Sequence, residues 1–433
     1  MSSPSSERPL GAIHLAAVAV GAIVGVGIFF TPAALARVTP GPTSALAIWI
    51  LGGVATLAGA LVFADLGVKW PRAGGLYVFL REGFPGRVGQ ALSFLYGWLQ
   101  LLVVQPGAMA IIAVVLVDHV AHLTGEVSPA ARAVGACAAI VVFVAANLFG
   151  LRTSGRVQIA MSALKLGTLV AIIAVGARFG HASLVTAQQP TTHATGGWSS
   201  WLLLGMIPVL FTFGGAYHAT FVAGSVRDPE RSIPRGLAYG IAAVLVGYIG
   251  VNVAYFALLG HAGLAASKSP AADAMVVALG SAAGNVTAAV IVVSAAGILN
   301  TVSLGFPFVV YAMANDGVFF ARFGTLDPRT GRPTLAVALQ GALACVAVLV
   351  GSARVDVLLT GIAFADATFQ AAIAIAHLRS GARRYAPALV ALTFLVIECG
   401  VAIGCLVRAP RESSYGVIAL VIGVVVWASW RRR

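Results

Sequence analysis

Residues 21–32 have the sequence GAIVGVGIFFTP, and this stretch decides what kind of protein the chain can form. It lies within an apolar segment from about residue 11 to residue 37. A helix needs about 20 such residues to cross a bilayer. Gly25, Val26 and Gly27 interrupt this segment, with Gly21 before them and Pro32 after them. Glycine pairs lower the cost of unwinding a helix, so the pattern predicts a broken membrane span. The alternative is close helix packing through small residues.

The composition of the whole chain agrees with a membrane protein. Of its 433 residues, 59% are hydrophobic and only 9% are charged. Soluble domains carry about 25% charged residues. A soluble fold of this size cannot bury that much apolar surface. The composition therefore excludes a cytosolic enzyme, a disordered tail and a nucleic-acid-binding protein.

Apolar segments long enough to cross a membrane recur along the entire chain. They predict an all-α integral membrane protein with twelve transmembrane helices, leaving no soluble domain. The expected spans are 11–37, 43–69, 88–121, 130–149, 157–179, 200–226, 236–260, 284–314, 333–351, 355–377, 386–407 and 414–430.

The basic residues predict the orientation. Formal net charge is +13. With the N-terminus inside, nineteen Lys and Arg fall in inner segments and seven in outer ones. Cytoplasmic loops carry such an excess, so we expect a multi-pass protein of the cell (inner) membrane with both termini cytoplasmic. The seven outer residues are Arg37, Arg132, Arg178, Lys268, Arg354, Arg408 and Arg411.

A second interruption matches the first. The sixth span contains Gly214 and Gly215, with Pro208 upstream. Spans one and six hold equivalent places if two five-span halves form an inverted repeat, and interrupted spans at such places point to a transporter site. We expect a cytoplasmic tail (1–10), two repeats (11–180 and 200–378), and two accessory helices with a basic C-terminal end (386–433).

Lys165 is the one basic residue that membrane topology does not explain. It lies in the middle of the fifth span, nine residues after Arg156. That separation is about 13 Å, more than a snorkelling side chain can cover in full. Charge at this depth costs about 2.5–3.5 kcal/mol. We therefore favour a cation beside the binding site over a snorkelling lysine.

Two acidic residues and one histidine also lie at membrane depth. Asp366 is deep in the tenth span, Glu398 is in the eleventh and His218 follows Gly214 by four residues. Intramembrane carboxyl groups are candidate proton carriers, and Asp366 is the candidate we select. For Glu398 and His218 we favour ordinary polar roles, because the last two spans lie outside the repeat and because His218 suits the edge of a cavity.

Sequence signatures of other activities are missing. The chain has no GxxxxGK[ST], HExxH or CxxC motif, and no apparent catalytic set. We therefore expect no catalytic residue, cofactor or metal site. All four cysteines lie in apolar runs and resemble small buried hydrophobic residues: Cys137, Cys345, Cys399 and Cys405.

Several motifs together resemble one known family. Residues 21–29 resemble the first-span signature of the amino acid–polyamine–organocation transporters. Residues 64–66 and 71–77 resemble the end of that family's second span. Within the superfamily, the L-type amino acid transporter branch matches best. The matches to this branch are 105–106 with 110–113, 156–158 with 165–166, and 213–215 through 228–234.

The resemblance implies a LeuT-like fold, in which two inverted five-span repeats carry discontinuous helices 1 and 6 and two accessory helices follow. It implies an amino-acid site at the two breaks, with Phe211 as an occluding gate. It also places Lys165 where sodium-coupled relatives hold a cation, so sodium dependence is not expected. The substrate-binding residues that we select are Ile23, Gly25, Val26, Gly27, Phe211, Gly214, Gly215 and Ala216.

These features predict a sodium-independent amino-acid permease that works by alternating access. Val26 and Ala216 offer no charge to a substrate side chain, so small neutral amino acids are expected. The segment 119–131 has no cysteine for a disulfide-linked heavy-chain subunit. Exchange and proton symport both stay open, as do monomer and homodimer. The alternatives are an amine or polyamine carrier, for which Asp366 is the only candidate acid, and a non-transporting receptor or an embedded enzyme.

Overall fold

The computed structural model describes residues 11–70, 75–149, 155–181, 197–215, 228–351 and 354–430. Within these ranges every regular element is a helix. This all-helical architecture is the one that the sequence predicts. In lipid, a helix satisfies its own backbone hydrogen bonds, which an open strand cannot do.

Within the described residues, each segment that the sequence marks as apolar contains at least one helix. Five short elements lie between the longer ones: α4 (Leu76–Gly83), the π-helix η1 (Gln100–Val104), α11 (Pro270–Leu279), α13 (Pro307–Asn315) and a 3₁₀ turn at Ala321–Phe323. The longer elements are α1 (Ala12–Ile23), α2 (Gly27–Val38), α3 (Pro42–Lys69), α5 (Gly86–Leu99), α6 (Gln105–Thr124), α7 (Pro129–Leu148), α8 (Gly155–Phe179), α9 (Gly197–Phe213), α10 (Pro229–Ala266), α12 (Ser281–Gly305), α14 (Thr334–Val350), α15 (Val355–Ser380), α16 (Ala388–Arg408) and α17 (Pro410–Trp430).

Many of these helices can cross a bilayer. Within the described ranges, eight helical segments are long and apolar enough, and the bent pair of α1 and α2 makes up to nine. Their outward side chains are apolar too: Val141 is 57% exposed, Val246 73% and Val396 68%. Such exposure suits lipid contact, so the molecule is a helical integral membrane protein. Twelve crossings remain a prediction.

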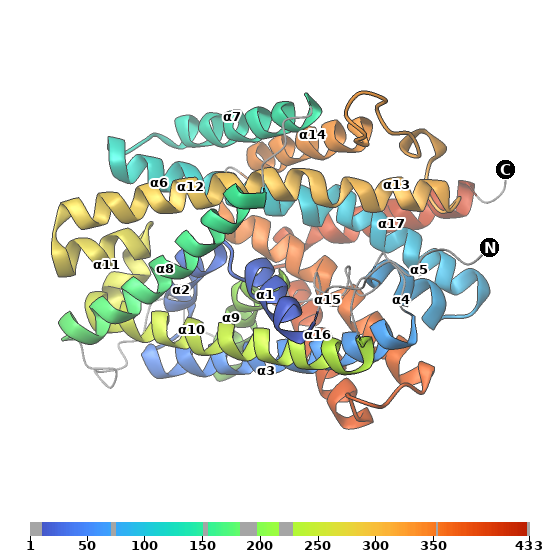
Figure 1. Ribbon diagram of the computed structural model, residues 1–433, viewed down its shortest axis with the longest axis horizontal. Helices are drawn as coiled ribbons and strands as arrows, with labels where there is room; N and C mark the ends of the chain where they lie inside the picture. Colours follow the sequence, from blue (N-terminus) through green and yellow to red (C-terminus); the bar gives the residue numbers. More distant parts are fainter. Residues whose placement is uncertain are drawn as a thin grey trace.

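The helices form a bundle with the broken ones at its centre. Figure 1 shows α7 and α14 along one side and α3 with α10 along the opposite side. Between them lie α1, α2, α9 and α15. The contacts agree with this view, since α1 packs on α10, α2 on α9 and α15 on α9.

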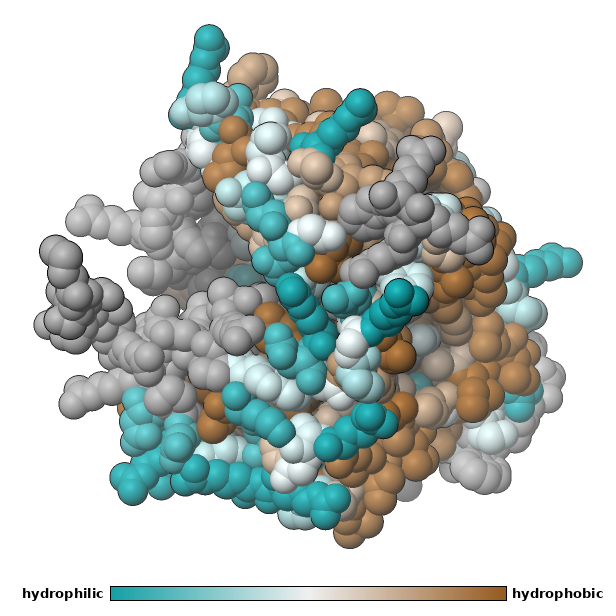
Figure 2. Space-filling view, turned by 90° about the vertical axis from the view of Figure 1, so that its right-hand side faces the viewer, coloured by the Kyte–Doolittle hydropathy of each residue, from teal (hydrophilic) through white to brown (hydrophobic). Residues whose placement is uncertain are grey.

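One end of the bundle is polar. The right-hand end in Figure 1 carries α4, α5 and α13. Figure 2 looks onto this end and shows hydrophilic residues gathered on it, with a hydrophobic flank beside them. A polar end beside an apolar flank is the surface expected where a bundle leaves the membrane.

Candidate functional site

The first apolar segment is broken as the sequence predicts. Helix α1 ends at Ile23 and α2 begins at Gly27, with a bend of 55° between them. The first N–H groups of a helix have no partner within it, and the helix dipole adds partial positive charge there. The start of α2 is therefore suited to a carboxylate, and the end of α1 presents free carbonyl groups.

The expected second interruption, at Gly214 and Gly215 directly after α9, lies against the first break. A Cβ added to Gly215 would lie 2.1 Å from the carbonyl oxygen of Ala22. A Cβ on Gly27 would lie 2.8 Å from Oγ1 of Thr212. These two glycines are thus required by the close approach of α1, α2 and the end of α9. The hydroxyl groups of Thr31 and Thr212 are 2.7 Å apart and join α2 to α9.

The neighbouring glycines leave space instead of closing it. An added Cβ at Gly214 would meet nothing within 4 Å. One at Gly25 would find only the Ile23 oxygen at 3.8 Å and Cδ1 of Ile298 in α12 at 4.0 Å. The breaks therefore combine a tight contact at Gly27 and Gly215 with ordinary van der Waals contact at Gly25 and open space at Gly214. A methyl group would fit at either of the last two positions.

Lys165 lies at the first break, where the sequence places it. The side chain comes from α8 and is 4% exposed. Its Nζ donates a hydrogen bond to the carbonyl oxygen of Val24 at 3.1 Å. Snorkelling does not describe this geometry, because the ammonium group ends on the unwound backbone. The break leaves the Val24 carbonyl without a partner inside the helix, and Lys165 satisfies it with a hydrogen bond.

An aromatic cluster that the sequence does not predict lies behind the breaks. The Tyr248 hydroxyl donates to the Ile23 carbonyl oxygen at 3.0 Å, and this residue is fully buried. Its ring packs against Trp49 and Phe213, with centroid distances of 5.4 and 5.3 Å. The Ile23 carbonyl thus already has one donor and retains one lone pair for a ligand. The only sequence signal was a tyrosine within an apolar span.

A large cavity, which we call the vestibule, opens from the α2–α6–α11 end. Its volume is about 780 Å³. Phe30, Ile207, Pro208 and Leu359 contribute apolar lining. The Phe30 ring lies 6.2 Å from that of Phe211, centroid to centroid. Phe211 is thus placed next to the vestibule lining, as a gate would be.

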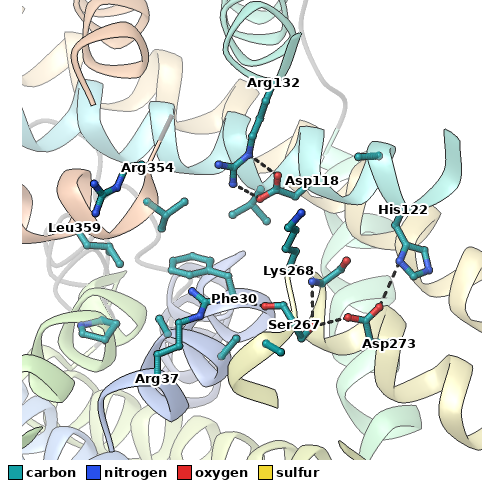
Figure 3. A pocket seen from close by; sticks show the side chains of 18 of the residues that line it. Phe30, Arg37, Asp118, His122, Arg132, Ser267, Lys268, Asp273, Arg354 and Leu359 are labelled. Atoms are coloured by element: carbon teal, nitrogen blue, oxygen red, sulfur yellow. Dashed lines mark hydrogen bonds and ion pairs between the residues drawn. The ribbon is translucent and has the colours of Figure 1, made fainter. Parts of the chain in front are cut away.

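Charged side chains of both signs surround the vestibule and largely pair with one another (Figure 3). The Arg132 guanidinium contacts both carboxylate oxygens of Asp118, at 2.6 and 2.5 Å. His122 lies 3.5 Å from Asp273, and Lys268 lies 3.4 Å from Glu126. Arg37 donates to the carbonyl oxygens of Ala265 and Ser267, each at 2.8 Å. This pairing leaves no strong field of one sign at the entrance.

The opposite end of the bundle is held closed by polar contacts. Tyr77 of α4 donates to Asp316 at 3.0 Å, and Arg81 donates to the same Asp316 oxygen at 2.9 Å. Burial, reinforced by the nearby Asp316 charge, raises the pKa of Tyr77 to about 12. Nearby, the buried Asp65 carboxylate lies 2.9 Å from Nε2 of His377. One end is therefore open and the other closed.

A second cavity, which we call the small cavity, contains the intramembrane acids. Its volume is about 60 Å³, and Asp366 and Glu398 both line it beside Phe211 and Gly214. The Gln100 amide donates to Oδ1 of Asp366 at 3.0 Å. From the sequence, only Asp366 is a candidate proton carrier, because Glu398 belongs to an expected accessory helix. Packing of α16 on α15 brings them into one cavity.

The structure brings together most of the predicted site residues. Ile23, Gly25, Val26 and Gly27 form the first break, and Phe211, Gly214 and Gly215 lie at the end of α9. Ala216 and His218 lie outside the described residues. Asp366 lines the small cavity together with Phe211 and Gly214.

Comparison with known proteins yields one family. The family model for amino acid permeases matches residues 10–427. A serine/threonine exchanger of Bacillus subtilis is 28% identical over 80% of this chain and 77% of its own length. The human cystine/glutamate transporter is 29% identical over 58% of this chain and 50% of its own length. The mouse Asc-type amino acid transporter 1 is 28% identical over 61% of this chain and 50% of its own length.

Proposed function

The chain belongs to the amino acid permease family, and we propose that it is a sodium-independent secondary transporter of small neutral amino acids. The observation that carries the proposal is the pair of helix interruptions in contact, at Gly27 and Gly215, with Lys165 bonded to the first of them. It acts by binding and moving a solute, so no catalytic residue is invoked. Exchange and proton-coupled uptake are the two modes consistent with this site.

Each part of the substrate has a counterpart at the breaks. The N–H groups at the start of α2, around Gly25 to Gly27, suit the carboxylate. The remaining lone pair of the Ile23 carbonyl suits the ammonium group. Val26, which is buried, and the open side of Gly214 offer no charge to a side chain. Phe211 closes the site from the vestibule side.

Sodium independence follows from the position of Lys165. Its ammonium group lies 3.1 Å from the Val24 carbonyl, at the unwound backbone. A sodium ion on the same carbonyl would lie within direct repulsive range of that ammonium group. The lysine thus supplies a fixed cation where a sodium-coupled carrier would bind one.

The vestibule supports neutral substrates over cationic ones. Its Arg132–Asp118 and Lys268–Glu126 pairs neutralise each other, so neither sign of charge is concentrated. An amine or polyamine carrier needs acids in its binding site, and Asp366 lines a cavity of only about 60 Å³. That volume holds about two water molecules, too little for a diamine.

The wider organisation belongs to the same proposal. We infer twelve spans with helices 1 and 6 discontinuous, in repeats 11–180 and 200–378, followed by accessory helices in 386–433. Both termini face the cytoplasm, and the vestibule faces outward. We expect no disulfide-linked heavy chain, since residues 119–131 contain no cysteine. The chain acts in the cell membrane as a monomer or homodimer.

Uptake into proteoliposomes tests this function. Purified protein is reconstituted, and uptake of labelled neutral, acidic and cationic amino acids and a polyamine is measured with sodium or choline outside. Serine or another small neutral amino acid should enter at the same rate in both salts. Preference for the polyamine, or uptake that needs sodium, would contradict the proposal. Binding without flux would instead indicate a receptor.

A further inference from the structure

We propose that Asp366 and Glu398 form one proton-binding site in the small cavity, and that its occupancy controls the second helix interruption. This inference rests on the proposed function, because it assigns the coupling ion of that same transporter. It selects proton-coupled uptake from the two modes left open above. It also gives α16, an accessory helix, a direct part in transport.

The two carboxyl groups lie at the same cavity. Asp366 lies in the middle of α15 and Glu398 in the middle of α16. Both line the small cavity. Glu398 is 5% exposed, and within the described part of the chain no hydrogen-bond or ion-pair partner is found for it. An unpartnered carboxyl group at this depth is costly to the fold and points to a ligand.

The lining around the two acids offers them no positive charge among the described residues. The described residues that line the small cavity include no Lys, Arg or His. Oε1 of Gln370, which also lines the cavity, is buried without a hydrogen-bond partner in the described structure. Two carboxylates without a cation repel each other and lose their hydration. One shared proton removes one of the two charges and supplies a donor for these acceptors.

A distorted helix positions the carboxyl group of Asp366. Gln105 donates to Gln100 at 2.9 Å, and Gln100 donates to Asp366 at 3.0 Å. Gln100 begins the π-helix η1, which packs against α15. π-Helical turns are rare and often occur at functional sites. This relay orients Oδ1 of Asp366 as an acceptor and leaves Oδ2 available.

Few other titratable groups face the pair. Tyr96 of α5 packs on Phe369 of α15, with a centroid distance of 5.5 Å, and its phenol is close enough to interact with Asp366. Asp65 of α3 is bonded to His377 of α15. The described part of α9 contains no titratable side chain. The carboxyl pair is therefore the group near the small cavity that can take up a proton.

The small cavity adjoins the substrate site. Phe211, Phe213 and Gly214 at the end of α9 line it, and the next residue, Gly215, contacts the first break at Ala22. A proton that removes one of the pair's two charges changes the polarity behind Phe211 and Gly214. One proton then moves with each neutral substrate, so that one positive charge crosses the membrane per cycle.

The volume argues for a proton over a metal cation. About 60 Å³ holds about two water molecules, and cations such as sodium or calcium require several oxygen ligands. The side-chain oxygens at hand are those of Asp366, Glu398, Gln370 and Thr56. Sodium therefore serves as the competing outcome in the test.

The experiment compares two modes of transport in proteoliposomes. Exchange of labelled serine is measured at equal pH on both sides, and net uptake is measured with an inward pH gradient while an internal dye reports pH. The unmodified protein should perform both and acidify the interior. Asp366→Asn and Glu398→Gln should each lower the rates of net uptake and of acidification at least tenfold. They should retain exchange, because the neutral side chains imitate the protonated pair. Glu412→Gln, on neighbouring α17, should match the unmodified protein.

The outcomes separate the two proposals. Absence of all exchange by the unmodified protein overturns the proposed function itself. Exchange without gradient-driven uptake or acidification overturns the proton site alone. Sodium-driven uptake overturns both the proton site and the sodium independence of the proposed function. Full acidification by both variants also overturns it. Should neither variant fold, infrared difference spectra of the unmodified protein between acid and alkaline buffer decide. A titrating protonated-carboxyl band supports the pair, and its absence overturns the pair.

Discussion

At the residue scale, the proposed binding site and its sodium independence depend most on Lys165. Its hydrogen bond to Val24 joins α8 to the first break at 3.1 Å. A hydrogen bond to a charged group contributes about 1.5–3 kcal/mol. Lys165→Ala should therefore lower transport about 10- to 100-fold while membrane insertion is retained. The measurement is initial uptake by equal amounts of reconstituted protein.

The matched control is another lysine. Lys268→Ala removes a side chain that is 77% exposed and pairs with an exposed Glu126. Surface pairs of this kind contribute about 0–1 kcal/mol, so uptake should change less than fivefold. Equal transport by Lys165→Ala and the unmodified protein would leave the lysine without a role.

Gly215 tests the contact between the two breaks. A Cβ there would lie 2.1 Å from the Ala22 carbonyl oxygen, which is backbone and cannot turn away. Gly215→Ala should destabilise the protein by about 1–3 kcal/mol, as overpacking does. Thermal unfolding in detergent measures this. Gly21→Ala, where nothing lies within 4 Å, should be neutral or slightly stabilising. Equal stability of both variants would show that the breaks do not touch.

At the scale of elements, one end of the bundle is closed by the contact of Tyr77 and Arg81 in α4 with Asp316, directly after α13. This closure should be independent of pH over the usual range. Tyr77 must be protonated to donate to Asp316, and its pKa is raised to about 12. The pKa of Tyr77 in the folded protein lies above the ordinary tyrosine pKa of 10.0, so the contribution to closure is complete below about pH 10. It is lost only as the pH rises from about 10 to 12.

Spin labels on α4 and α13 measure this closure. Their distance distribution should be unchanged between pH 6 and pH 9. Asp316→Ala should increase the open population about two- to fivefold, because the Arg81 and Asp316 side chains are 36% and 46% exposed and such pairs are weak. If the distance between the labels increases between pH 6 and pH 9, groups other than Tyr77 and Asp316 hold this end closed.

At the scale of the whole molecule, the sequence predicted the architecture well and the site in part. The apolar segments and the interruption at Gly25–Gly27 depend on local composition, so the chain alone reveals them. The position of Lys165 was predictable because a mid-span charge has few explanations.

Contacts between distant segments could not be predicted in this way. Tyr248 at Ile23, Thr212 at Thr31 and Glu398 beside Asp366 depend on how helices pack. Glu398 was assigned an ordinary role because its helix lies outside the repeat. Packing of α16 on α15 places Glu398 at the small cavity, and no local sequence pattern predicts such a contact.

Counterflow of a labelled small neutral amino acid tests the central claim most directly. Proteoliposomes are loaded with unlabelled serine, and entry of external labelled serine is followed without sodium. The account predicts transient accumulation that depends on the internal serine and disappears when the vesicles are loaded with a polyamine. Labelled serine that fails to accumulate under any loading, while the protein is folded and inserted, would contradict the claim that this chain is an amino-acid transporter.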